Sequence, residues 1–111
     1  YAEAVTRGSG GSAATAVDLI NELRLRAGAS TITSGQLTTE MVMDERSREL
    51  YWEGLRRPDL IRYNKFVSGT YLWPFKGGAA NGTSVSDHLK LFPIPEDVLL
   101  VNPNIKQNPN Y

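Results

Sequence analysis

The chain has 111 residues, of which 41% are hydrophobic and 22% are charged, and it contains no cysteine. This length is enough for one small domain, and the lack of cysteine excludes a disulfide scaffold, a thiol nucleophile and a cysteine zinc site. Twelve Lys and Arg residues balance twelve Asp and Glu residues, so the sequence predicts no basic surface for nucleic acid, and no apolar run is long enough to span a membrane.

The first 28 residues predict two helical segments joined by a flexible turn. The start of the chain resembles the end of a helix already under way, so we expect a segment of a longer protein. After the glycine-rich turn at residues 8–11, Ser12 is an N-cap candidate for a helix over residues 13–27. Small and apolar residues recur there at spacings of three and four. Gly28 stands where a left-handed C-terminal cap is expected.

The middle of the chain predicts two further helices. Thr38 is a plausible N-cap for a helix that runs from about Thr39 to Glu53 or Gly54. Pro58 can begin another short helix as its first residue, because proline lacks the N–H that this position leaves unpaired. We therefore expect residues 1–66 to form a helical scaffold within a mainly α-helical fold.

Residues 67–111 predict long loops and an extended tail. Gly, Ser and Thr are frequent over residues 67–90, and the tail beyond Leu91 is rich in Pro and Asn. Pro95 can start one or two helical turns through Leu100, after which the residues that precede proline avoid the α region.

Three glutamates spaced by four are the most informative polar pattern. Glu45, Glu49 and Glu53 would share one helix face, where like charges repel. Arginines surround them, and arginine is suited to bidentate carboxylate pairing. The favoured interpretation is an ion-pair lattice between helices. Its predicted members are Glu45, Glu49, Glu53, Arg46, Arg48, Arg56, Arg57, Asp59 and Arg62.

Two other interpretations of these carboxylates stay open. Two of them could act as the acid and base of a glycosidase, although nearby arginines favour ionised carboxylates and an acid catalyst needs a raised pKa. A di-metal helical bundle needs a histidine near its glutamates, and the single histidine, His88, is distant in sequence. No metal and no cofactor is predicted.

An alternating aromatic group marks the loop-rich part. Tyr71, Trp73 and Phe75 could form a short strand or an aromatic loop. Exposed aromatic rings can stack on sugar faces, and Tyr and Trp also offer a polar edge. The alternative is that the rings close the side of a helical core.

Three blocks of the sequence carry recognisable motifs. Residues 21–28 read N-x-x-R-x-R-A-G, and residues 45–63 contain ER-x-x-EL-x-x-EG-x-R-x-x-DL-x-R. Residues 91–95 contain PIP, and residues 102–111 read NPNIKQNPNY. In this order they resemble the C-terminal part of SusD-like (SusD/RagB) proteins, the outer-membrane nutrient-binding lipoproteins of the Bacteroidetes, in whose usual ending Gly is common at the position of Asn110.

This resemblance implies a mainly α fold of tetratricopeptide-like helix pairs with long loops. It also implies that residues 1–111 are the C-terminal part of a longer, lipid-anchored protein on the cell surface, without its N-terminal part and anchor. Such a protein would bind a glycan or oligosaccharide without catalysis and deliver it to a SusC-like TonB-dependent transporter. Residues 45–63 would belong to its scaffold.

Two rival functions remain at this point. One is a helical protein-interaction scaffold that binds no sugar, and the other is the glycosidase with two of Glu45, Glu49 and Glu53. We also expect this chain by itself to expose apolar surface and to self-associate, because an isolated helix pair cannot bury its apolar face.

Overall fold

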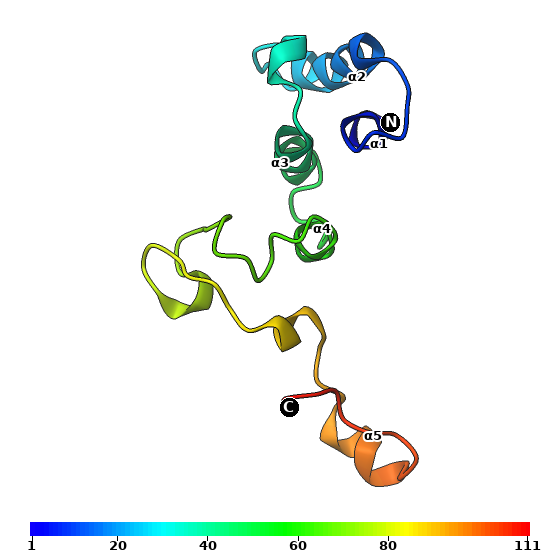
Figure 1. The fold of residues 1–111 in the computed structure, drawn as a ribbon, viewed down its shortest axis with the longest axis vertical. Coiled ribbons are helices and arrows are strands. Elements are labelled where there is room, and N and C mark those ends of the chain that lie inside the picture. The colour runs from blue at the N-terminus through cyan, green and yellow to red at the C-terminus, as the bar shows by residue number, and fades with distance from the viewer. The chain divides into compact units, whose positions relative to one another are not determined.

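The computed structural model describes all of residues 1–111 and shows a helical chain without strands (Figure 1). It divides into two compact units, residues 1–59 and residues 60–111. Helix α4, Arg56–Arg62, crosses this boundary. None of the helices has the length and hydropathy that crossing a membrane requires.

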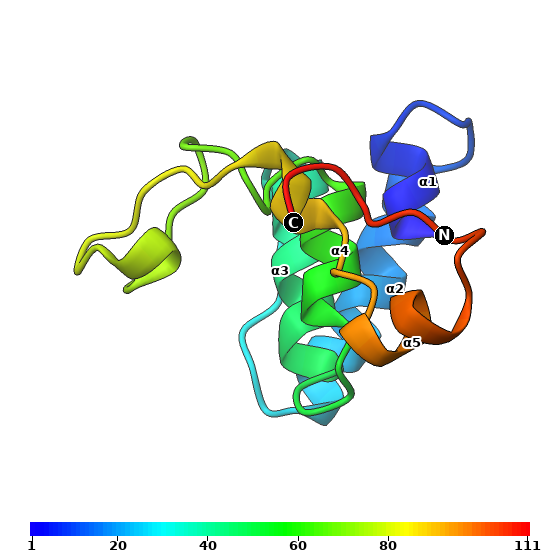
Figure 2. The ribbon, with the colours of Figure 1, turned by 90° about the horizontal axis from the view of Figure 1, so that it is seen from below.

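The first unit holds α1 (Ala2–Thr6), α2 (Ala13–Arg26), a 3₁₀ turn (Ser34–Gln36) and α3 (Thr39–Glu49). Helix α1 contacts both α2 and α3, and Figure 2 shows it beside α2. These contacts enclose a small apolar core. Its buried members are Ala2, Ala16, Val17, Ile20, Ile32 and Val42.

Helix α2 begins and ends as its sequence predicts. The Ser12 side chain accepts a hydrogen bond from the Thr15 amide, which confirms the N-cap. Past the end of the helix, Gly28 has a φ of 69°. The amide of Ala29 donates to the Arg24 carbonyl at 2.8 Å, and the amide of Gly28 donates to the Leu25 carbonyl at 3.0 Å. Together they form a Schellman cap.

Helix α3 is shorter than its sequence predicts. It begins after the Thr38 N-cap, as expected, but it ends at Glu49 rather than at Glu53 or Gly54. Trp52 and Gly54 both adopt positive φ, 70° and 72°, which is incompatible with a right-handed helix. The basic residues of the last turn also favour an end at this point, where the helix dipole is negative.

Helix α4 starts two residues earlier than predicted. It begins at Arg56, so Pro58 is its third residue rather than its first. A proline fits there because the first four backbone N–H groups of a helix have no partner inside the helix.

The second unit is built from turns and short helices. It holds two 3₁₀ turns, Lys76–Gly78 and Asp87–Lys90, and the helix α5, Glu96–Val101. Figure 2 shows the loop that carries the first of these turns. Only Leu60, Tyr63 and Lys76 are buried among residues 60–111, so this unit has little apolar core.

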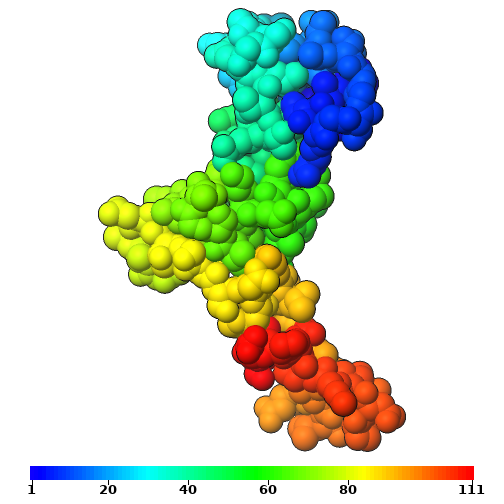
Figure 3. All heavy atoms as spheres, in the orientation of Figure 1, coloured from blue at the N-terminus to red at the C-terminus, as the bar shows by residue number.

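The C-terminal tail folds back along residues 91–94 (Figure 3). The Gln107 side chain donates to the Ile94 carbonyl at 2.9 Å and accepts from the Ile94 amide at 2.8 Å. The Asn108 side chain donates to the Phe92 carbonyl at 2.7 Å, and the Tyr111 hydroxyl donates to the Leu91 carbonyl at 2.8 Å. Side chains of the tail, rather than backbone groups of a paired strand, therefore form hydrogen bonds to the backbone of residues 91–94.

Candidate functional site

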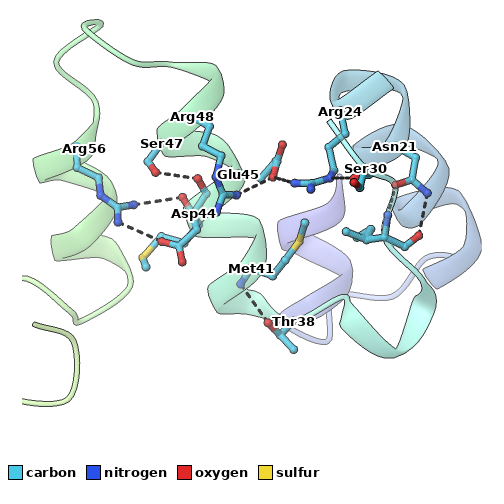
Figure 4. A network of polar contacts seen from close by, with 12 residues as sticks. Asn21, Arg24, Ser30, Thr38, Met41, Asp44, Glu45, Ser47, Arg48 and Arg56 are labelled. Atoms are coloured by element: carbon cyan, nitrogen blue, oxygen red, sulfur yellow. Dashed lines mark hydrogen bonds and ion pairs between the residues drawn. The ribbon is translucent and has the colours of Figure 1, made fainter. Parts of the chain in front are cut away.

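The first candidate feature is a set of charged contacts around Glu45 on α3. Glu45 is only 7% exposed. One of its oxygens, Oε2, lies 2.6 Å from Nη1 of Arg24 on α2 and 2.8 Å from Nη1 of Arg48, one turn along α3 (Figure 4). Arg24 also donates from Nε to the Ser30 carbonyl at 2.6 Å. The Glu45 carboxylate thus joins α3 to α2, and Arg24 in turn contacts the loop that follows α2.

A second set joins α3 to the start of α4. Nη2 of Arg56 lies 3.1 Å from the Asp44 carboxylate, and Nη1 of the same group donates to the Met43 carbonyl at 3.3 Å. Nε of Arg46 lies 3.0 Å from the carboxylate of Asp59, which is buried. The turn between the two helices is therefore bounded by charged pairs on both sides.

The other predicted members of the lattice are Glu49, Glu53, Arg57 and Arg62. Glu49 pairs with Arg26 at the end of α2, and this contact raises the pKa of Arg26 above its ordinary value. Glu53 lies exposed in the turn after α3 and does not continue the row of carboxylates. The guanidinium of Arg62 lies 4.9 Å from the ring centre of Tyr63, and Arg57 is half-buried.

Three charged partners were not among the predicted residues. They are Arg24, Arg26 and Asp44. The two arginines stand in the last turn of α2, where the sequence explains them as favourable charges at a helix C-terminus. Only the packing of α2 near α3 shows that they also bind the α3 carboxylates, over 21 and 23 residues of sequence.

A pocket of about 670 Å³ lies at the turn between α3 and α4. Its volume falls within the range of about 300–1,000 Å³ that small-molecule sites occupy. Two aromatic residues, Tyr51 and Trp52, form part of its lining, with their ring centres 5.7 Å apart and nearly perpendicular. Polar groups from Arg46, Ser47 and Arg57 complete one side.

A buried lysine organises the aromatic loop of the second unit. Lys76 is 2% exposed, and its ammonium group donates to three backbone carbonyls. The partners are Lys65 at 3.1 Å, Tyr71 at 2.8 Å and Ser68. The Trp73 ring covers the same group, with its centre 4.6 Å from Nζ. Burial lowers the pKa of Lys76.

The three aromatic residues predicted to contact glycan differ in their surroundings. Trp73 is half-buried between Lys76 and the Phe66 ring, whose centre lies 6.3 Å away. Tyr71 is also half-buried. Phe75 is 74% exposed at a φ of 65°. The segment is a loop rather than a strand, and only Phe75 presents most of its ring to solvent.

Metal chemistry finds no support in the arrangement of side chains. No group of three or more His, Asp or Glu side chains is placed to hold a metal ion. Glu45, the most buried of the three glutamates, has its Oε2 occupied by two guanidinium groups. This geometry suits a structural contact between helices.

The chain is similar to glycan-binding proteins over its whole length. A sequence model of the SusD family matches residues 1–111. The starch-binding protein SusD of Bacteroides thetaiotaomicron is 43% identical over 110 residues, which are 99% of this chain and 19% of that protein. This chain therefore spans about a fifth of the length of that relative.

Solved structures of a glycan-binding protein are also similar to this chain. The surface glycan-binding protein A of Bacteroides thetaiotaomicron is 33% identical and superposes with a TM-score of 0.75 over 99% of this chain and 22% of that one. Its complex with laminarihexaose superposes with a TM-score of 0.70 at 32% identity, over 96% of this chain and 22% of that one.

Proposed function

Because the chain belongs to the SusD family, we propose that it is a scaffold segment of a cell-surface protein that binds glycan without catalysis. The observation that supports this most directly is the similarity, over nearly the full chain, to a starch-binding protein and to a protein solved with laminarihexaose. The names of both relatives describe binding rather than a reaction.

The lattice of charged contacts would be the scaffold's means of fixing its helices. Arg24, Arg48 and Glu45 join α2 to α3, and Arg46 with Asp59 joins α3 to α4. The pairing of helices that results is the unit that a tetratricopeptide-like arrangement would repeat. Two candidate surfaces for ligand are the pocket beside Trp52 and the exposed side chain of Phe75.

We propose that the protein is lipid-anchored in the outer membrane and delivers oligosaccharide to a SusC-like TonB-dependent transporter. Membership of the SusD family supports this proposal. It is tested by co-purification with a tagged SusC-like transporter from the same organism, for which an unrelated TonB-dependent transporter is the control.

Binding of glycan is tested by calorimetry with maltohexaose, a starch fragment, and with laminarihexaose. In parallel, residues 1–111 replace the corresponding segment of the relative SusD. The proposal expects the chimera to fold and to bind maltohexaose as the relative does. A chimera that folds but binds no glycan, together with a chain that binds neither oligosaccharide, would contradict it.

One observation favours a second function, a protein-interaction scaffold. Several large apolar side chains are exposed. They include Tyr51, Trp52, Leu100 and Val101. The first two lie in the first unit and the last two in the second, and exposed apolar patches mark protein interfaces as well as ligand grooves. Affinity for the transporter without any affinity for glycan would favour this alternative. Self-association of the chain through the same residues would be measured by sedimentation at several protein concentrations.

A further inference from the structure

The turn after α3 holds a large aromatic side chain in an unfavourable backbone conformation. Trp52 has a φ of 70° and is 88% exposed. A bulky residue in the left-handed region is uncommon and strained. Exposure of the indole also forgoes the free energy that its burial would contribute. Neither backbone preference nor core packing within this unit explains a tryptophan here, and such strain is typical of functional positions.

The pocket beside Trp52 combines aromatic faces with fixed polar groups. Tyr51 and Trp52 both line the 670 Å³ space, and their ring planes lie 74° apart. The guanidinium of Arg46 is held by Asp59, and that of Arg56 by Asp44. These groups are positioned before any ligand arrives, which lowers the ordering cost of binding.

The polar groups around this pocket favour a ligand that is rich in hydroxyl groups. Three arginines line it, Arg46, Arg56 and Arg57, and the first two are each paired with a carboxylate. Guanidinium N–H groups, the Ser47 hydroxyl and the Asp59 carboxylate line the space with both donors and acceptors. A pyranose ring has one apolar face for an aromatic ring and hydroxyl groups around its edge.

We propose that the pocket at the α3–α4 turn is a sugar subsite in which a glucose unit stacks on the indole of Trp52, with Tyr51 and Arg46 at its edge. The subsite rests on the proposed glycan-binding function and assigns a position to it. The ion pairs that join α3 to α4 then have a second role, because they hold the polar wall of the pocket.

The test uses the whole 111-residue chain and two oligosaccharides, maltohexaose and laminarihexaose. The chain has two tryptophans, so a Trp73→Phe variant leaves Trp52 as the single indole. We expect its emission to shift to shorter wavelength, saturably, with at least one of the two sugars. Trp52→Gly, measured by calorimetry without the Trp73 change, should weaken binding at least about tenfold.

The same variant separates binding from folding. Glycine adopts positive φ without strain, so the melting temperature of Trp52→Gly should equal or exceed that of the wild type. Leu25→Ala is the matched control, because Leu25 is an exposed apolar residue of the same unit outside the pocket. Its affinity for sugar should not change.

Four results would overturn the subsite. Sugar binding that Trp52→Gly leaves unchanged would place the site elsewhere, while the glycan-binding function itself would stand. A melting temperature that falls together with affinity would make Trp52 structural. Self-association that depends on Trp52, without a response to sugar, would make the pocket a protein interface. If the wild-type chain and the SusD chimera both bind no sugar, the proposed function fails as well.

Discussion

Replacement of Lys76 by methionine would remove the one charge around which the loop of residues 65–85 is arranged. Methionine keeps most of the apolar stem and deletes the ammonium group. Three backbone carbonyls, of Lys65, Ser68 and Tyr71, then lose their donor, and Trp73 loses the cation beneath its ring. Because this unit has little apolar core, other contacts cannot compensate.

The expected loss follows from these contacts. A hydrogen bond to a charged group contributes about 1.5–3 kcal/mol net, but burial of the ammonium also costs solvation free energy. We therefore take about 1 kcal/mol for each of the three bonds. Lys76→Met should destabilise the second unit by about 3 kcal/mol, a large part of the ordinary stability of a small domain.

Urea unfolding measures this loss. With Trp52 replaced by phenylalanine, Trp73 is the single indole and reports on the loop that Lys76 organises. With slopes of about 1–3 kcal/mol/M, the midpoint should fall by at least about 1 M. Lys106→Met makes the same chemical change at an exposed lysine and should stay within about 0.5 kcal/mol. An unchanged midpoint and unchanged Trp73 emission in Lys76→Met would refute the reasoning.

Three further outcomes can be measured on the same chain. Burial lowers the pKa of Lys76 below 10.5, so the free energy of unfolding of the wild type should rise with pH between that lowered pKa and 10.5. The loss of stability in Lys76→Met should therefore grow over this pH range. A loss that does not change with pH would contradict the shift. Glu45→Gln should lower the free energy of unfolding, measured by thermal unfolding, by about 2 kcal/mol, because two guanidinium groups lose a charged partner in a buried site. Glu53→Gln, at an exposed position, should leave the free energy of unfolding unchanged, and equal effects of the two changes would refute the lattice. Gly82→Ala should lower the free energy of unfolding by about 3 kcal/mol, because the φ of Gly82 is 76° and a Cβ would lie 2.5 Å from a backbone carbonyl oxygen. Gly78→Ala should lower it by only about 1 kcal/mol, because Gly78 has a φ of 80° but open space around it. Similar melting temperatures for the two variants would contradict the steric argument.

The helix caps show what local sequence can predict. The N-caps Ser12 and Thr38 and the left-handed Gly28 are where the sequence places them, because a cap depends on residues within one helical turn. The end of α3, in contrast, was predicted incorrectly. Helical periodicity continues through Tyr51 and Trp52, and the sequence gives no sign that Trp52 adopts a positive φ.

The charged contacts were predicted only in part. The sequence pattern predicted that the glutamates near Arg46 and Arg48 would pair with arginines, but the partners of Glu45 and Glu49 from α2 are 21 and 23 residues away. Only the contact of helices brings them together. Lys76 is a similar case, since a lone lysine in a glycine-rich loop is ordinarily exposed, and nothing local predicts that three carbonyls will surround it.

The sequence alone therefore determined the helical class, the caps and the family, because these depend on local periodicity, on residues within a turn of one another and on motifs of fixed spacing. The tertiary structure decided which arginine meets which carboxylate, which aromatic ring faces solvent and why Lys76 is buried. These depend on contacts between residues far apart in the chain, whose geometry no short stretch of sequence specifies.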